Sequence, residues 1–219
     1  MIARIIFWFR SMSPLLGTVF QLLYGMWRIG KYTPPFVSIF GGSRLKQTDY
    51  YALKAHELSQ RLVNANISVL TGGGPGIMEA ANCGIIYAPN GSAKSIGIGV
   101  RDLNEPTNIC VQEYMRVNQF WARKWLLTRY SVAFIVFPGG FGTLDELSEV
   151  LTLIQTHKVA PTPLILVGTE YWKPFMEWCT NQAFHHGAIK KEELELLFVT
   201  DDLEEVFQHA VRTCAACKA

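Results

Sequence analysis

The sequence predicts an α/β protein with a Rossmann-like three-layer fold, in which helices cover both faces of a mainly parallel sheet. Three observations support this prediction. Short, continuously apolar segments alternate with longer segments of helical periodicity, which is typical of parallel strands buried on both faces. Two of the apolar segments end in glycine-rich turns that open a helix. Hydrophobic residues make up 49% of the 219 residues and charged residues only 17%, which is the composition of a globular domain.

The elements follow in order along the chain. The predicted strands share unbroken apolar or small residues and are residues 36–40, 67–70, 95–100, 132–137 and 164–167. The predicted helices share apolar residues three or four positions apart and are residues 49–66, 77–86, 118–130, 144–155, 172–184 and 203–214. No internal repeat or low-complexity linker separates them. Residues 34–219 are therefore expected to form one Rossmann-like domain, preceded by an apolar helical extension at residues 1–33.

The N-terminal extension differs in composition from the rest of the chain. Residues 2–29 are rich in Ile, Phe, Leu and Trp, with Arg4, Arg10 and Arg28 among them. The longest uncharged stretch, residues 11–27, is slightly short for a membrane span, and no small-residue cleavage site follows it. We expect one or two helices that pack on the domain or on a second subunit. A membrane helix lying in the bilayer plane, apolar with basic flanks, is the less favoured alternative.

Charge and cysteine content exclude several classes of protein. The 20 basic and 18 acidic residues leave a net charge of +2, which offers no basic field for gathering nucleic-acid phosphates. The five cysteines are irregularly spaced, whereas a disulfide framework is typical of smaller secreted chains. Cys214 and Cys217 have CxxC spacing, but a zinc site needs two more ligands, so we expect free thiols on a terminal helix. The sequence thus predicts a cytoplasmic protein without a bound metal.

Two glycine-rich turns, residues 72–76 and 138–143, are the strongest functional signal. Each follows a predicted strand and precedes a predicted helix, so both should lie at the carboxyl edge of the sheet, where open parallel sheets bind ligands. The following helix directs unpaired N–H groups and the positive end of its dipole at the turn, and glycine lets a ligand approach closely. A phosphate fits this geometry. The sequence therefore predicts a site for a phosphorylated nucleotide, with two ordinary tight turns as the alternative.

The known dinucleotide and ATP motifs do not fit these turns. In the dinucleotide fingerprint, a third glycine permits close packing of the helix on the strand. Asp145 stands at this position after the second turn, and Ile77 stands there after the first. The Walker loop is also absent, because no Gly-Lys-Ser or Gly-Lys-Thr occurs in the chain. A mononucleotide is therefore a better prediction than NAD or ATP.

Carboxylates beside the turns have two interpretations. Thr143 and Glu146 are spaced as a capping box, in which Thr143 caps the helix and Glu146 reaches back to the Thr143 N–H. Alternatively, Glu146 faces the ligand from beside the phosphate loop. Glu79 lies three residues after Gly76 and either takes a similar position or is a first-turn carboxylate favoured by the helix dipole.

A basic pair, Arg123 and Lys124, lies on the predicted helix that precedes the strand at residues 132–137. We expect Trp121 and Trp125 to take the apolar face of that helix, so Arg123 should point elsewhere. A solvated basic face is the usual position of such a pair. Contact with a ligand is the alternative.

Three segments carry a family resemblance: residues 72–82, the Arg123-Lys124 pair and residues 138–146. Together they resemble the LOG (Lonely Guy) family of cytokinin riboside 5′-monophosphate phosphoribohydrolases and related nucleotide nucleosidases, often labelled lysine decarboxylase. The resemblance covers residues 35–207. It implies a Rossmann-like fold, a homodimer or larger homo-oligomer, and hydrolysis of the N-glycosidic bond of a nucleoside 5′-monophosphate, of the AMP or N6-modified AMP type. The decarboxylase label lacks support, because no recognisable pyridoxal-phosphate site is present.

The resemblance also implies roles for individual residues. Arg123 and Glu146 match the catalytic pair of the family. Breaking the glycosidic bond builds positive charge on the sugar ring, so Glu146 can stabilise that charge or deprotonate water, while Arg123 holds phosphate or the departing base. No cofactor or metal is required. The implied substrate- and phosphate-binding residues are Gly42, Ser43, Gly73, Gly74, Met78, Glu79, Lys124, Pro138, Gly139, Gly140, Gly142 and Thr143.

Two features depart from the compact plant members of the family. The apolar N-terminal extension is longer than theirs, and the segment around Arg123 is more aromatic. Both features place the chain nearer the larger bacterial branch, whose substrates are less uniform. The resemblance therefore implies the reaction class rather than cytokinin itself. The alternative function, within the same superfamily, is a nucleotide or molybdenum-cofactor binding or carrier protein without turnover.

Overall fold

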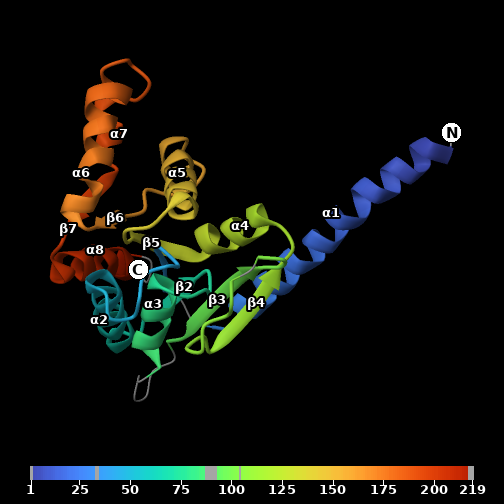
Figure 1. Cartoon of the computed structure of the whole chain (residues 1–219), viewed down its shortest axis with the longest axis horizontal. Coiled ribbons are helices and arrows are strands. Elements are labelled where there is room, and N and C mark those ends of the chain that lie inside the picture. Colours follow the sequence, from blue (N-terminus) through green and yellow to red (C-terminus); the bar gives the residue numbers. More distant parts are fainter. Residues whose placement is uncertain (1, 33–34, 87–92, 104, 217–219) are drawn as a thin grey trace.

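The computed structural model describes residues 2–32, 35–86, 93–103 and 105–216, without the side chains of residues 2–11, 13, 14 and 213–216. Of the CxxC pair, Cys217 and the side chain of Cys214 lie outside this description. The chain folds into three layers, with helices on both faces of one parallel sheet (Figure 1). This architecture confirms the predicted fold class.

The strands are β1 (Phe36–Phe40), β2 (Ser68–Thr71), β3 (Ser95–Val100), β4 (Glu113–Val117), β5 (Ser131–Val136), β6 (Leu164–Val167) and β7 (Leu197–Thr200). In the described part of the chain they form one seven-stranded sheet in the order β4-β3-β2-β1-β5-β6-β7. From β1 the chain adds strands on one side of the sheet and then returns to add β5, β6 and β7 on the other. The strand order therefore reverses between β1 and β5, and open α/β sheets bind ligands at such points.

The helices are α1 (Ile2–Ile29), α2 (Tyr50–Asn64), α3 (Ile77–Ile85), α4 (Phe120–Tyr130), α5 (Phe141–Gln155), α6 (Thr169–Trp178), the π-helix η1 (Cys179–Phe184), α7 (Lys191–Leu194) and α8 (Leu203–Ala216). Two apolar cores pack against opposite faces of the sheet, one with α2, α3 and α8 and the other with α1, α4, α5 and α6. Strand side chains alternate between the cores: Val37 and Ile39 enter the first, and Phe36 and Phe40 enter the second.

The N-terminal extension is a single long helix, α1. Its C-terminal end packs on the domain, because Ile29 is buried in the second core and a Cβ at Gly25 would lie 2.8 Å from Leu126 of α4. Its N-terminal half projects away from the domain (Figure 1). Within the described residues, no helix combines the length and the apolarity that crossing a bilayer requires.

The two edge strands, β4 and β7, are not apparent in the sequence. Edge strands are covered less fully than interior ones, so β4 carries Glu113 and Arg116 between its apolar residues. In β7 only the last residue, Thr200, is buried. A continuous apolar run therefore identifies only the interior strands, which are covered on both faces. The five predicted strands are all interior, and each lies within one residue of its expected bounds.

A disulfide joins Cys83 of α3 to Cys110, which precedes β4, with their Cα atoms 4.8 Å apart. The sequence did not indicate this pair. The two cysteines are 27 residues apart, with β3 between them, and only the packing of α3 beside the loop ahead of β4 brings them together. Cys179 is buried as a free thiol.

Candidate active site

The loops that follow β1 and β5 are joined by backbone hydrogen bonds at the carboxyl edge of the sheet. The Phe137 N–H donates to the Phe40 carbonyl, and the Gly42 N–H donates to the Pro138 carbonyl, each at 2.9 Å. A Cβ at Gly42 would lie 3.3 Å from the Cα of Gly139, so the absence of a side chain permits this close approach. The two loops therefore form one continuous surface where the strand order reverses.

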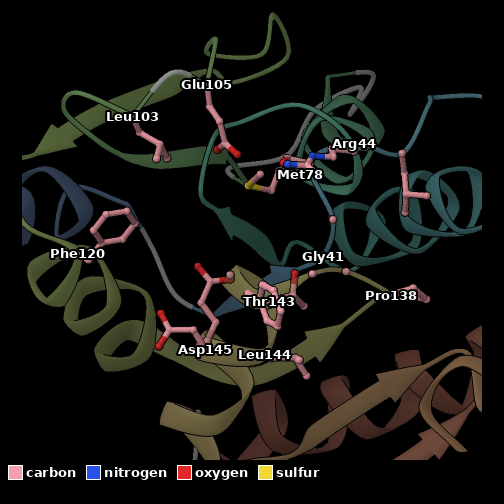
Figure 2. A pocket seen from close by; sticks show the side chains of 18 of the residues that line it. Gly41, Arg44, Met78, Leu103, Glu105, Phe120, Pro138, Thr143, Leu144 and Asp145 are labelled. Atoms are coloured by element: carbon pink, nitrogen blue, oxygen red, sulfur yellow. The ribbon is translucent and has the colours of Figure 1, made fainter. Parts of the chain in front are cut away.

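A pocket of about 920 Å³ opens on this surface. It is bounded by the two loops, the first turns of α4 and α5, Met78 of α3 and the residues that follow β3. Figure 2 shows Glu105 and Met78 on one side of the pocket and Thr143, Leu144 and Asp145 on the other. Its size suits a ligand of nucleotide dimensions.

Arg123 of α4 and Glu146 of α5 form an ion pair in this pocket through Nη2 and Oε1. Only 10% and 11% of the two side-chain surfaces are exposed. Burial raises the pKa of the Glu146 carboxyl, although the Arg123 guanidinium acts in the opposite direction. The Nε of Arg123 is buried without a hydrogen-bond partner among the described residues. The pair therefore places a carboxyl with a raised pKa in the wall of the pocket.

The orientation of α4 differs from the prediction. Trp121 and Trp125 are 47% and 37% exposed, whereas Arg123 is only 8% exposed. Ala122 and Leu126 take the apolar face instead. The row of side chains at 121 and 125 lies next to the row at 122 and 126 on the helix surface. Helical periodicity alone therefore does not decide which row faces the core. The expected solvated basic face is therefore wrong for Arg123.

The first glycine turn makes room for this arginine. A Cβ at Gly72 would lie 2.7 Å from Nη2 of Arg123 and 2.8 Å from Sδ of Met78. The guanidinium therefore occupies space that any side chain at Gly72 would take.

Buried amides hold the first glycine turn in place. Asn108 Nδ2 donates to the Gly74 carbonyl at 2.8 Å and to Oδ1 of Asn82 at 3.0 Å. The same Asn82 oxygen accepts a hydrogen bond from Thr71 Oγ1 at 2.8 Å. The Nδ2 of Asn82 donates to Ser95 Oγ at 2.7 Å. This network connects β2, α3, β3 and the loop before β4. A fully paired buried network of this kind favours a single conformation of the turn.

The second glycine turn leads directly into α5, which begins at Phe141 with Gly140 at its N-cap. The N–H groups of Thr143 and Leu144 donate to the Gly140 carbonyl at 3.0 and 3.1 Å. Thr143 thus lies inside the helix, and no side-chain hydrogen bond caps this end. The capping-box interpretation of Glu146 is therefore wrong, since its carboxylate pairs across to α4.

The glycines of the second turn have different surroundings. A Cβ at Gly139 would lie 2.1 Å from Oγ1 of Thr143, so no side chain fits there without movement. A Cβ at Gly140 or Gly142 would meet no atom within 4 Å. Both of these glycines line the pocket beside the N-terminus of α5. Its dipole and its first N–H groups make this a favourable position for an anion.

Lys124 links α4 to α5 next to the ion pair. Its Nζ lies 2.8 Å from Oδ2 of Asp145 and 2.8 Å from Oε2 of Glu149. Burial acts to lower the pKa of the Lys124 ammonium, but the hydrogen bonds to these two carboxylates outweigh it, and the pKa is raised. Lys124 therefore stays charged and ties the two helices together beside the pocket.

The pocket brings together most of the predicted site residues: Gly42, Ser43, Met78, Arg123, Lys124, Pro138, Gly139, Gly140, Gly142, Thr143 and Glu146. Gly73, Gly74 and Glu79 are not among the residues that line it. Gly73 has a φ of +74°, and a Cβ there would lie 2.6 Å from the ring of Tyr114. Glu79 accepts a hydrogen bond of 3.3 Å from Gln47. These residues of the first turn and of α3 therefore contact other parts of the domain and do not line the pocket.

Several lining residues were not predicted. Phe120 and Phe141 present exposed aromatic rings, with Phe141 92% exposed. Arg44 adds a cation and Glu105 a further carboxylate, and Tyr171 donates a hydrogen bond from its hydroxyl to the Gly139 carbonyl. Of these residues, only Phe141 could have been predicted from the sequence, because it stands between two glycines of the predicted phosphate-binding turn. The others come from separate segments that only the folded sheet brings to one edge.

These features define a Rossmann-like α/β protein with a glycine-lined pocket and a buried arginine–glutamate pair at the reversal point of its sheet. The family model described as "Possible lysine decarboxylase" matches residues 78–210. The chain is 36% identical over 174 residues to "Cytokinin riboside 5'-monophosphate phosphoribohydrolase LOG1" of Arabidopsis thaliana, covering 78% of this chain and 79% of the relative. It is 30% identical over 176 residues to "Probable cytokinin riboside 5'-monophosphate phosphoribohydrolase LOGL2" of Oryza sativa subsp. japonica, covering 78% and 70%. The chain belongs to the LOG family.

Solved structures share the fold at lower identity. The molybdenum cofactor carrier protein MCP of Chlamydomonas reinhardtii matches with a TM-score of 0.60 and 19% identity, over 84% of this chain and 99% of that protein. This likeness concerns the fold alone.

Proposed function

We propose that the chain is a nucleoside 5′-monophosphate phosphoribohydrolase. It hydrolyses the N-glycosidic bond of a nucleotide of the AMP or N6-modified AMP type and releases free base and ribose 5-phosphate. The observation that carries this proposal is the buried Arg123–Glu146 pair, which faces a pocket beside the glycine turn and the N-terminus of α5. The names of the two plant relatives support the same reaction class.

The substrate phosphate binds at the second glycine turn. Gly140 and Gly142 leave space there, and the first N–H groups of α5 point along the helix axis toward that space. Because the helix dipole also favours negative charge at its N-terminus, a phosphate needs no lysine or metal at this position. This anchor fixes the ribose within reach of the next turn of α5, which carries Glu146.

Glu146 acts on the sugar and on the attacking water. As the glycosidic bond breaks, positive charge develops on the ribose ring, and a fixed carboxylate whose side chain is largely buried stabilises it. The same carboxylate can take the proton of the water that adds to C1′ of the ribose and pass it to the departing base. Burial raises its pKa, which favours both proton transfers. Arg123 holds the carboxylate in place through its Nη2 group.

The exposed aromatic rings provide a surface for the base. Phe120 and Phe141 both line the pocket, and aromatic rings stack on the faces of nucleobases without demanding one base. Such a surface accommodates an N6 substituent as well as adenine itself. The alternative is binding or carriage of a nucleotide or molybdenum cofactor without turnover, and the algal protein of similar fold is named as a carrier of that cofactor.

A turnover assay separates these functions. The purified protein is incubated with a panel of nucleoside 5′-monophosphates that includes AMP and N6-prenylated AMP, and free base is measured by chromatography. We expect base release from at least one of them and a loss of about 100-fold or more in Glu146→Gln. Glu177→Gln, an exposed glutamate of α6 outside the pocket, is the matched control and should retain most activity. Tight nucleotide binding without base release from any monophosphate would favour the carrier alternative.

A further inference from the structure

Helix α1 carries a broad apolar face that the domain leaves uncovered. Between residues 12 and 27 its exposed large apolar side chains are Met12, Leu15, Leu16, Val19, Phe20, Leu23, Tyr24, Met26 and Trp27. Phe20 and Trp27 are 71% and 59% exposed. At 100° per residue these positions cover about half of the helix circumference. Contiguous apolar surface of this extent marks an interaction site on a soluble domain.

The opposite side of α1 fastens the helix to the domain. Thr18 and Ile29 are fully buried, and Gln21 accepts a hydrogen bond of 2.7 Å from the Asn118 N–H just before α4. Arg28 pairs with Glu113 of β4 and also donates to the Tyr24 hydroxyl. These contacts hold the C-terminal part of α1 in one orientation, so its apolar face points away from the domain. Figure 1 shows that the N-terminal half extends beyond every other element.

The charges of α1 are of one sign. The helix contains no acidic residue. Its basic residues are Arg4, Arg10 and Arg28, of which Arg28 pairs with Glu113 of the domain, and Lys31 follows its last turn. The Lys31 ammonium lies 3.5 Å from the centre of the Trp27 ring. Tyrosine and tryptophan with adjacent basic residues are typical of the boundary between lipid headgroups and acyl chains. Anionic headgroups attract such basic residues electrostatically.

We propose that the outward face of α1 binds the surface of an anionic lipid bilayer, with the helix lying in the interface and the domain on its aqueous side. Among the described residues, no helix is both long and apolar enough to cross the bilayer. A second copy of this chain is the competing occupant. A helix that packs against one partner helix buries a stripe little wider than about 100°, whereas the lipid phase can cover the whole half-cylinder.

Vesicle flotation with the full-length protein tests the proposal. The vesicles contain phosphatidylcholine with about 30% phosphatidylserine, and phosphatidylcholine alone serves for comparison. The test variant is Phe20→Glu with Trp27→Glu. The matched control is Trp178→Glu with Phe184→Glu, which changes the same residue types at exposed positions of α6 and η1, at 56% and 40% exposure.

We expect the native protein to float with the anionic vesicles and to bind neutral vesicles more weakly. The test variant should show a partition coefficient lower by about tenfold or more, and the control variant should bind like the native protein. All the altered side chains are exposed, so circular dichroism and the melting temperature should confirm that each variant is folded. Failure of the native protein to float, or equal binding by the test variant, would overturn the proposal. A second result would also overturn it: no vesicle binding, together with sedimentation without lipid that shows an oligomer for the native protein and a monomer for the test variant. In that case the apolar face of α1 joins two copies of the chain.

Discussion

The guanidinium of Arg123 lies in the space that a side chain at Gly72 would fill, since a Cβ there would come within 2.7 Å of Nη2. This relationship connects the turn after β2 to the ion pair between α4 and α5. It also gives a role to the first glycine turn, residues 72–76, which does not line the pocket. The first turn positions the arginine, and the second opens the pocket toward an anion.

Gly72→Ala should therefore reduce both activity and stability. The added methyl group displaces the Arg123 guanidinium and misplaces Glu146 with it, so we expect kcat/KM to fall by about tenfold to 100-fold. Overpacking at one buried position should lower the free energy of unfolding by about 1–3 kcal/mol. Steady-state kinetics and thermal unfolding measure the two effects. Gly17→Ala, where a Cβ would meet no atom within 4 Å, is the control, and native kcat/KM in Gly72→Ala would contradict a role for this contact.

Gly140→Ala should affect ligand binding without affecting the fold. The backbone at Gly140 has φ −94° and ψ −155°, which alanine adopts readily, and its Cβ would touch no protein atom. The methyl group instead enters the space beside the N-terminus of α5. We expect AMP affinity, measured by calorimetry, to fall by about tenfold while the melting temperature stays close to the native value. Unchanged affinity would place the phosphate elsewhere.

The pH dependence of turnover should report the burial of Glu146. Because burial raises the pKa of this carboxyl, the base form is lost at a higher pH than for an exposed glutamate, whose pKa is about 4.3. Activity should fall as pH decreases through this raised pKa. In Arg123→Gln the nearby positive charge, which acts to lower the pKa, is gone, so the acidic limb should move to still higher pH. A pH–rate profile of kcat/KM checks both statements, and an acidic limb at the ordinary glutamate value would contradict them.

The same raised pKa predicts a stability effect with a defined sign. A carboxyl whose folded pKa exceeds its unfolded pKa binds its proton more tightly in the folded state, so stability declines as pH rises from the unfolded to the folded value. Glu146→Gln removes this titration. We expect the melting temperature of the native protein to fall across that pH window relative to the variant, as followed by scanning calorimetry. Parallel curves for the two proteins would rule out a perturbed Glu146.

Reduction of the Cys83–Cys110 disulfide should lower stability. The bond closes a loop with a sequence separation of 27 residues, and loss of such a constraint on the unfolded chain costs about 3 kcal/mol. Denaturant unfolding with and without reductant measures this difference. Cys83→Ser with Cys110→Ser should unfold at the same denaturant concentration in both conditions. A reductant effect that persists in this variant would have another origin.

Local patterns in the sequence were sufficient for much of the fold. The five interior strands are continuous apolar runs because both of their faces are buried, and the glycine turns stand where two of them end. Edge strands lack this signal. The first residues of α5 also escaped prediction, because the glycine-rich segment continues into the first turn of the helix, which contains Gly142.

The sequence by itself determined the five interior strands and their order along the chain, the two glycine turns and the residue types that carry the proposed chemistry. Only the tertiary structure decided that Arg123 points inward while Trp121 and Trp125 remain exposed. Burying a guanidinium is unfavourable unless a carboxylate comes within reach, and that carboxylate lies 23 residues away on another helix. The packing of α4 against α5 brings the two together, and Gly72, from a third segment, leaves the room in which they meet. No local pattern contains a distance between helices, which is why the pair could be named from the sequence but its geometry could not.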